Sequence, residues 1–115
     1  MHELSLADSM INQLIEYKRE HNIDKIISIT VLIGKYSGVE REPFEFAFPI
    51  VAEETELNGA SLIIEEEDVV VKCKNCGQET KLTVHFIKCG NCDSRDVTFV
   101  KGRKCIIKSF EIEEN

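Results

Sequence analysis

The chain has 115 residues, a formal net charge of -7 at pH 7, and 43% hydrophobic residues. This length supports one ordinary hydrophobic core plus a small metal-stapled module, and the acidic balance argues against general nucleic-acid binding. No apolar run approaches the roughly 20 residues that cross a bilayer, and the first residues do not form a charged-then-apolar leader. We therefore expect a soluble cytoplasmic protein that does not associate with a membrane.

The first segment has the pattern of an amphipathic helix. Apolar residues recur at helical spacing from Leu4 onward, which predicts a helix over residues 6–21. Ser5 and Asp8 fit a capping box at its start, and Asn22 fits its C-terminal end.

The next elements are a strand and a second helix. Residues 25–33 are rich in β-branched side chains, and simple alternation places Ile27 on the same face as Ile29, Val31 and Ile33. A loop over residues 34–38 leads to a helix for which Pro43 is a suitable first residue. Pro49 lacks a backbone donor, so we expect a kink there, or a helix that restarts.

The rest of the chain predicts strands over residues 60–66, 81–87 and 104–111, with residues 81–87 closing a small hairpin. The expected fold class is α+β, with two helices packed on a small three-stranded sheet. A zinc-ribbon-like module is inserted before the last strand. The expected division is an α/β domain of residues 1–71 plus 104–115 and a zinc-binding domain of residues 72–103.

The two C-x2-C pairs are the strongest motif of the chain. They are separated by twelve residues, and they place four thiols where a tetrahedral Zn(II) can bind them: Cys73, Cys76, Cys89 and Cys92. Two disulfides are the alternative, which a reducing compartment disfavours, and iron can occupy the same S4 cage. Because four protein ligands leave no open position, the metal here is expected to be structural.

The charge is unevenly distributed. Residues 72–104 hold eight Lys or Arg against three acidic residues, a formal charge of +5 within an acidic chain. A zinc-ribbon module that binds nucleic acid or a protein is therefore the alternative function. Its only aromatic residues are Phe86 and Phe99, too few to interleave with the basic residues, which counts against nucleic acid. An acidic protein partner explains the asymmetry at least as well.

Few residues could carry catalysis, and we expect no enzyme activity. Cys105 lies in an apolar strand, where a lone cysteine is usually inert. His21 ends a helix, where its positive form would favour the dipole, and His85 fits a solvent-facing position on the hairpin.

His2 stands beside the terminal amine of Met1. The amine, the imidazole and the amide nitrogens of His2 and Glu3 can form adjoining chelate rings, and four nitrogens in a plane suit Ni(II) or Cu(II) better than zinc. The alternative is a histidine that stands at a frayed terminus by chance.

Several segments together carry a resemblance to a known family. They are residues 1–5 (MHELS), 34–40 (GKYSGVE), 46–48 (FAF), 58–60 (NGA) with Leu62 and Ile64, and the paired C-x2-C motifs. In this combination the whole chain resembles the HypA/HybF family of hydrogenase maturation nickel metallochaperones. Pro49 departs from the uninterrupted second helix that is usual in the family.

The resemblance implies a function and a set of ligands. Nickel would be held by Met1, His2 and Glu3, with Glu40 as nearby support, and structural zinc by the four cysteines. Ni(II) would be a transient cargo, delivered to the immature large subunit of nickel-iron hydrogenase and, for some members, to urease. The implied partners are a hydrogenase maturation GTPase, the large subunit precursor and urease maturation proteins, with no nucleic acid.

Overall fold

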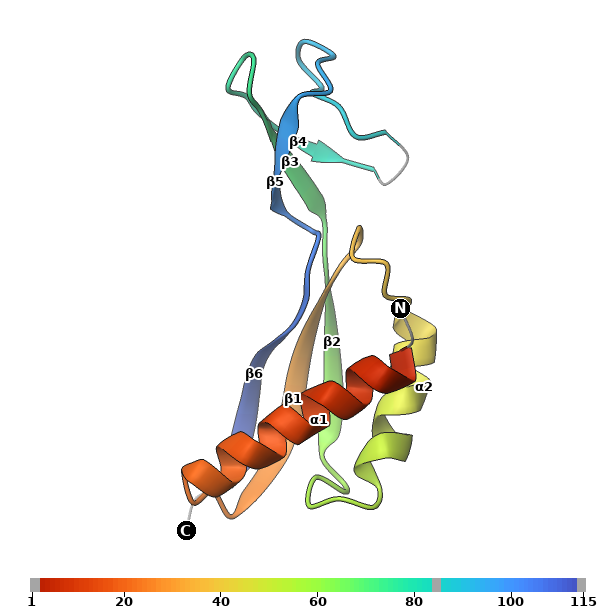
Figure 1. Ribbon diagram of the computed structural model, residues 1–115, viewed down its shortest axis with the longest axis vertical. Helices are drawn as coiled ribbons and strands as arrows, with labels where there is room; N and C mark the ends of the chain where they lie inside the picture. The colour runs from red at the N-terminus through yellow and green to blue at the C-terminus, as the bar shows by residue number, and fades with distance from the viewer. Residues whose placement is uncertain (1–2, 84–85, 114–115) are drawn as a thin grey trace.

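The computed structural model describes residues 3–83 and 86–113 and is elongated, measuring 54 × 27 × 17 Å. Two three-stranded sheets follow one another along its long axis, and both helices lie against the first sheet (Figure 1). This arrangement is the α+β fold expected from the sequence, with the cysteine-rich module inserted before the last strand.

The first sheet is built around β1 (Lys25–Gly34), which lies between β2 (Ser61–Glu67) and β6 (Cys105–Glu113). β2 is parallel to β1, and β6 is antiparallel to it. The three strands lie close to their predicted positions.

One side-chain assignment in β1 is wrong. Ile27 is 43% exposed, whereas its neighbour Ile26 is buried in the core. The pairing of β1 with β6 shifts register between Ile26 and Ser28, which marks a bulge. A bulge adds one residue to a strand and reverses the alternation beyond it, so Ile26 takes the core position that simple alternation gave to Ile27.

Helix α1 (Glu3–Glu20) begins three residues earlier than predicted. Ser5 therefore lies inside the helix, and the proposed capping box is wrong. The Asp8 carboxylate instead accepts a hydrogen bond from Asn12 Nδ2 at 3.5 Å. Asn22 ends the helical turn as predicted, with a φ of 51°, and Ile23 N–H donates to the Lys18 carbonyl at 2.9 Å.

Helix α2 (Arg41–Ala52) runs through Pro49 without a break, so the expected restart is wrong. Pro49 removes one helical donor, but the turn continues because Glu53 N–H donates to the Pro49 carbonyl at 3.0 Å. Burial on both sides of the proline holds the helix on the core through Phe44, Ala47, Phe48 and Ala52.

The second sheet has the order β4 (Glu79–Leu82), β3 (Val69–Cys73), β5 (Val97–Lys101). The predicted strand over residues 81–87 is wrong in extent, because β4 ends at Leu82. Leu82 pairs with Val69, the first residue of β3, so no partner strand remains for the residues that follow. Residues 84–85, including His85, lie outside the described part of the chain.

The chain crosses between the sheets at Asp68 and again at Gly102. Gly102 has a φ of 97°, and a Cβ there would lie 2.5 Å from Val69 Cα. Only glycine fits such a close backbone approach at this φ. The second sheet thus includes Val69–Val71 by hydrogen bonding, while the division of the chain into residues 1–71 plus 104–115 and 72–103 stays a prediction.

Candidate metal centres

The four cysteines meet at the far end of the second sheet. Cys73 ends β3 and Cys76 follows in its turn, while Cys89 and Cys92 lie in the loop before β5. Their sulfurs all lie within 4.8 Å of one another, and they form the one group of three or more potential metal ligands among the described residues.

The sulfur spacing fits one tetrahedral metal. Cys73 Sγ lies 3.6 Å from Cys92 Sγ, and Cys76 Sγ lies 3.5 Å from Cys89 Sγ. Four sulfurs bound to one zinc at about 2.3 Å stand roughly 3.8 Å apart, close to these separations. The cysteines are free thiols, so the cage does not fit the disulfide alternative.

The two C-x2-C turns have the same backbone design. The sulfur of Cys73 accepts hydrogen bonds from the N–H groups of Asn75 and Cys76, at 3.3 and 3.4 Å. The sulfur of Cys89 accepts in the same way from Asn91 and Cys92, at 3.3 and 3.5 Å. Donors aimed at sulfur favour the thiolate, which is the metal-binding form.

These donors lower two of the thiol pKa values. The N–H groups of Cys76 and Asn75 hold the pKa of Cys73 at about 6, and those of Cys92 and Asn91 lower the pKa of Cys89. The Ser94 N–H favours the Cys92 thiolate, but the hydrogen bond with Cys73 and burial outweigh it and raise the pKa of Cys92 to about 11. The donor set therefore matches a thiophilic cation that displaces the remaining protons.

Two asparagine side chains complete the cage. Asn75 Nδ2 lies 3.8 Å from Cys92 Sγ, and Asn91 Nδ2 lies 3.6 Å from Cys76 Sγ. Each asparagine thus reaches from its own turn to a sulfur of the other turn. Sequence reasoning missed these residues, although both turns carry an asparagine directly before their second cysteine.

The second predicted site is at the chain terminus, and Met1 and His2 lie outside the described residues. Glu3 is the first residue of α1, and its Oε2 accepts a hydrogen bond from Glu40 N–H at 3.4 Å. Glu40 is the N-cap of α2. The structure therefore brings Glu3 and Glu40 together where the two helices begin (Figure 1).

The remaining candidates have structural surroundings. Cys105 is half-buried in β6, and burial raises the pKa of its thiol. The hollow beside it offers no general base, since its other side chains are those of Leu6, Ser9, Met10, Gln13, Ile106 and Ile107.

His21 is engaged at the end of α1. Its ring stacks on Tyr17 with centroids 3.9 Å apart, and its Nδ1 lies 3.0 Å from the Tyr17 carbonyl oxygen. No helix among the described residues is long and apolar enough to cross a membrane.

Comparison with known proteins gives consistent matches along the whole chain. Residues 1–112 match the family model described as hydrogenase/urease nickel incorporation, metallochaperone, hypA. The hydrogenase maturation factor HypA of Pyrococcus abyssi is 36% identical over 99% of this chain and 97% of its own length. That of Chlorobaculum tepidum is also 36% identical, over 98% of this chain and 100% of its own.

Solved structures agree with the sequence matches. The solution structure of the Ni metallochaperone HypA from Helicobacter pylori superimposes with a TM-score of 0.74 at 30% identity, and covers 97% of each chain. A second solution structure, of a HypA protein, has a TM-score of 0.75 at 30% identity and covers 98% of this chain and 97% of that one.

Proposed function

Because this chain belongs to the HypA family of nickel incorporation metallochaperones for hydrogenase, we propose that it binds Ni(II) at its N-terminus and delivers it to the immature large subunit of nickel-iron hydrogenase. Its role is delivery rather than catalysis, and nickel is its cargo. Maturation of urease is a second destination consistent with the family description.

The proposed nickel ligands are the Met1 amine, the His2 imidazole and the backbone nitrogens of His2 and Glu3. The observation that carries this assignment is the contact of Glu3 Oε2 with Glu40 N–H at 3.4 Å, because it anchors the residue next to His2 at the start of α2. The Glu3 carboxylate is then near enough to the terminus to serve as a further ligand, with Glu40 as support. Nitrogen donors in a plane suit Ni(II).

The cysteine cage differs from the nickel site because it is closed, and we assign it structural Zn(II). All four ligands come from the protein, and a tetrahedral set of thiolates suits zinc. Bound zinc would join the turn after β3 to the loop before β5 and so hold the second sheet together. In this proposal the nickel bound at the terminus is released to a partner, whereas the zinc in the closed site is retained.

The proposed partners are a hydrogenase maturation GTPase, the precursor of the hydrogenase large subunit and, for urease, its maturation proteins. With such partners, the protein would act in the cytoplasm. A site on a chain terminus suits transfer, because a partner protein can approach a metal bound there without the rest of the fold having to open.

The test is metal stoichiometry in the untagged, zinc-loaded protein. Equilibrium dialysis should give one nickel per chain for the parent, close to none for His2→Ala, and unchanged zinc in both. His21→Ala is the matched control, because His21 belongs to the end of α1 and should leave nickel binding intact. Equal nickel binding by His2→Ala and the parent would show that the N-terminal assignment is wrong.

A further inference from the structure

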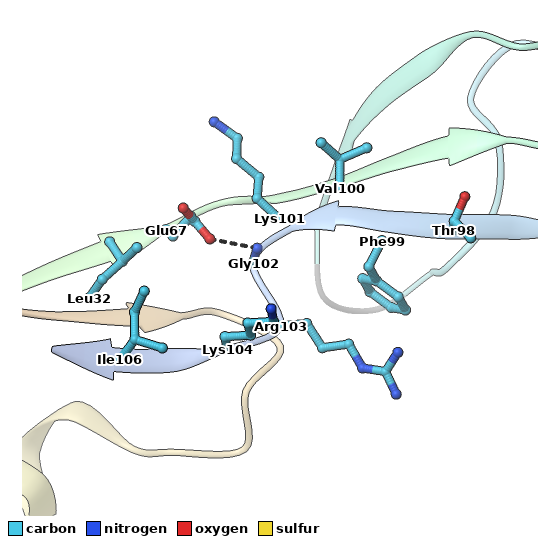
Figure 2. Close-up of a pocket in the computed structure, with 10 residues that line it drawn as sticks. All are labelled: Leu32, Glu67, Thr98, Phe99, Val100, Lys101, Gly102, Arg103, Lys104 and Ile106. Atoms are coloured by element: carbon cyan, nitrogen blue, oxygen red, sulfur yellow. Dashed lines mark hydrogen bonds between the residues drawn. The ribbon is translucent and has the colours of Figure 1, made fainter. Parts of the chain in front are cut away.

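A groove of about 450 Å³ lies where the chain leaves the second sheet and rejoins the first (Figure 2). It is formed by residues 98–104, together with Leu32, Glu67 and Ile106. Its volume falls within the range of about 300–1,000 Å³ that is usual for ligand pockets. No residue of the proposed nickel site or of the cysteine cage lines it.

Three cations of the groove have no ionic partner among the residues that the structure describes. Eight salt bridges in the described part of the chain engage eight Lys or Arg residues, and Lys101, Arg103 and Lys104 are not among them. The three side chains spread around Gly102 (Figure 2). Arg103 also lies over the Phe99 ring, with its Cζ 5.0 Å from the centroid.

One carboxylate, that of Glu67, also lines the groove. Glu67 Oε1 already accepts a hydrogen bond from Gly102 N–H at 2.8 Å. One negative charge against three positive charges leaves the groove positive, although the whole chain has a net charge of -7. A local excess of this kind attracts an anionic group.

The groove also exposes apolar side chains. Val100 is 50% exposed and Ile106 is 45% exposed, and Leu32 lies beside Ile106 on the neighbouring strand. Covering large aliphatic side chains that are this exposed lowers the free energy of the complex. A ligand that makes only ionic contacts would leave these apolar side chains exposed to water.

Backbone groups are available along the same line. β5 is an edge strand of the second sheet, and β6 is an edge strand of the first. An edge strand offers unpaired N–H and C=O groups to an extended segment of another chain.

We propose that this groove binds an extended acidic segment of a partner protein, whose carboxylates meet Lys101 and Lys104 and whose apolar side chains cover Val100 and Ile106. Nucleic acid fits less well because its evenly spaced phosphates cannot avoid the acidic run of residues 65–68, of which Glu67 lines the groove. A phosphate backbone carries a charge at every nucleotide, whereas a peptide can space its carboxylates among apolar residues.

The probe is a fluorescein-labelled peptide of eight residues with the sequence DSVSDSVS, in which Asp and Val lie on the same face of an extended strand. Fluorescence anisotropy at low salt is expected to show binding to the zinc-loaded parent. The same peptide with Asn in place of Asp should bind poorly.

The variant is Lys101→Gln with Lys104→Gln, which keeps the Arg103 contact with Phe99. It should weaken binding by about tenfold, since two close ion pairs are lost. The control is Lys25→Gln with Arg95→Gln, which changes the net charge equally but outside the groove, and should stay within about twofold. Nickel stoichiometry should be unchanged in both, so this inference and the proposed function fail separately.

Three outcomes would overturn the inference. Equal weakening in both variants would show attraction by overall charge rather than by the groove. Binding of random duplex DNA with the same loss in Lys101→Gln/Lys104→Gln would identify a nucleic-acid site. Absence of peptide binding by the parent, with self-association of that variant in light scattering, would show that the lysines only guard the strand edges.

Discussion

Asn75 and Asn91 hold equivalent places in the two cysteine turns, and each donates toward a sulfur of the opposite turn. Hydrogen bonds from outside a ligand set reduce the charge on thiolates and fix their direction. These two side chains therefore connect the two turns of the cage, in addition to the bonds that a bound metal would make.

Replacing either asparagine with alanine should loosen the zinc site. We expect Asn75→Ala or Asn91→Ala to release zinc to a chromophoric chelator about tenfold faster, with the overall fold retained. Asn58→Ala is the control, because Asn58 lies in the turn before β2. Release rates equal to that of the parent in both cage variants would show that the amides only cover the surface.

Helix α2 carries two prolines in different settings. Pro43 stands third in the helix, where its missing N–H costs nothing, because the first-turn donors have no helical acceptor. Pro49 stands inside the helix, where the Glu45 carbonyl loses its ordinary donor. Both prolines are exposed, so neither contributes much packing.

This difference predicts opposite effects on stability. Pro49→Ala should raise the free energy of unfolding by about 1–2 kcal/mol, because it restores one helical hydrogen bond and relieves the ring contact. Pro43→Ala should change it by about 0.5 kcal/mol or less. Urea unfolding of the zinc-loaded proteins gives both values, and an unchanged midpoint for Pro49→Ala would count against the argument.

At the level of elements, sequence periodicity predicted both helices and the three strands of the first sheet close to their observed positions. Its errors arose where pairing decides the outcome. The face of Ile27 depends on a bulge made with β6, and the end of β4 depends on where β3 begins. β6 lies far along the chain from β1, and β3 lies outside the segment predicted as residues 81–87, so no pattern within either segment could report the pairing.

The sites were predictable to different degrees. The cysteine cage was evident because four ligands at fixed spacing specify their own geometry. The contact between Glu3 and Glu40 is different, since it joins residues 37 positions apart and depends on how the two helices pack. The groove at Gly102 could not be read from the sequence, because it exists only where two sheets meet.

The junction between the sheets has several independent contacts. Asp68 pairs with Lys35 at 2.6 Å and with Lys81 at 2.9 Å, and these lysines, Lys35 first, lower its pKa to about 2. Tyr36 stacks on Phe99 with centroids 5.3 Å apart. Lys35 and Tyr36 follow β1, whereas Lys81 and Phe99 belong to the second sheet, so the loop after β1 fastens the two sheets together.

Gly102 should be the least replaceable residue of this junction. In Gly102→Ala a Cβ would meet Val69 Cα at 2.5 Å, and the φ of 97° is unfavourable for alanine. We expect a loss of about 3 kcal/mol or more in unfolding free energy. Gly38→Ala is the control, with a similar φ of 82° and open space around it, and should cost about 1 kcal/mol. Equal losses would mean that the close approach at Gly102 can relax.

The insertion of the second sheet between β2 and β6 also constrains how the molecule folds. Ile33 pairs with Cys105, 72 positions later. The second edge of β1 can therefore be covered only after the last part of the chain is present. Pairings this distant close large loops and slow the search for the native state. During synthesis, the cysteine-rich module leaves the ribosome before the sheet behind the helices can be completed. Early metal capture by that module would shorten the loop that β6 must close, and so would hasten assembly of the half in which we propose the nickel site.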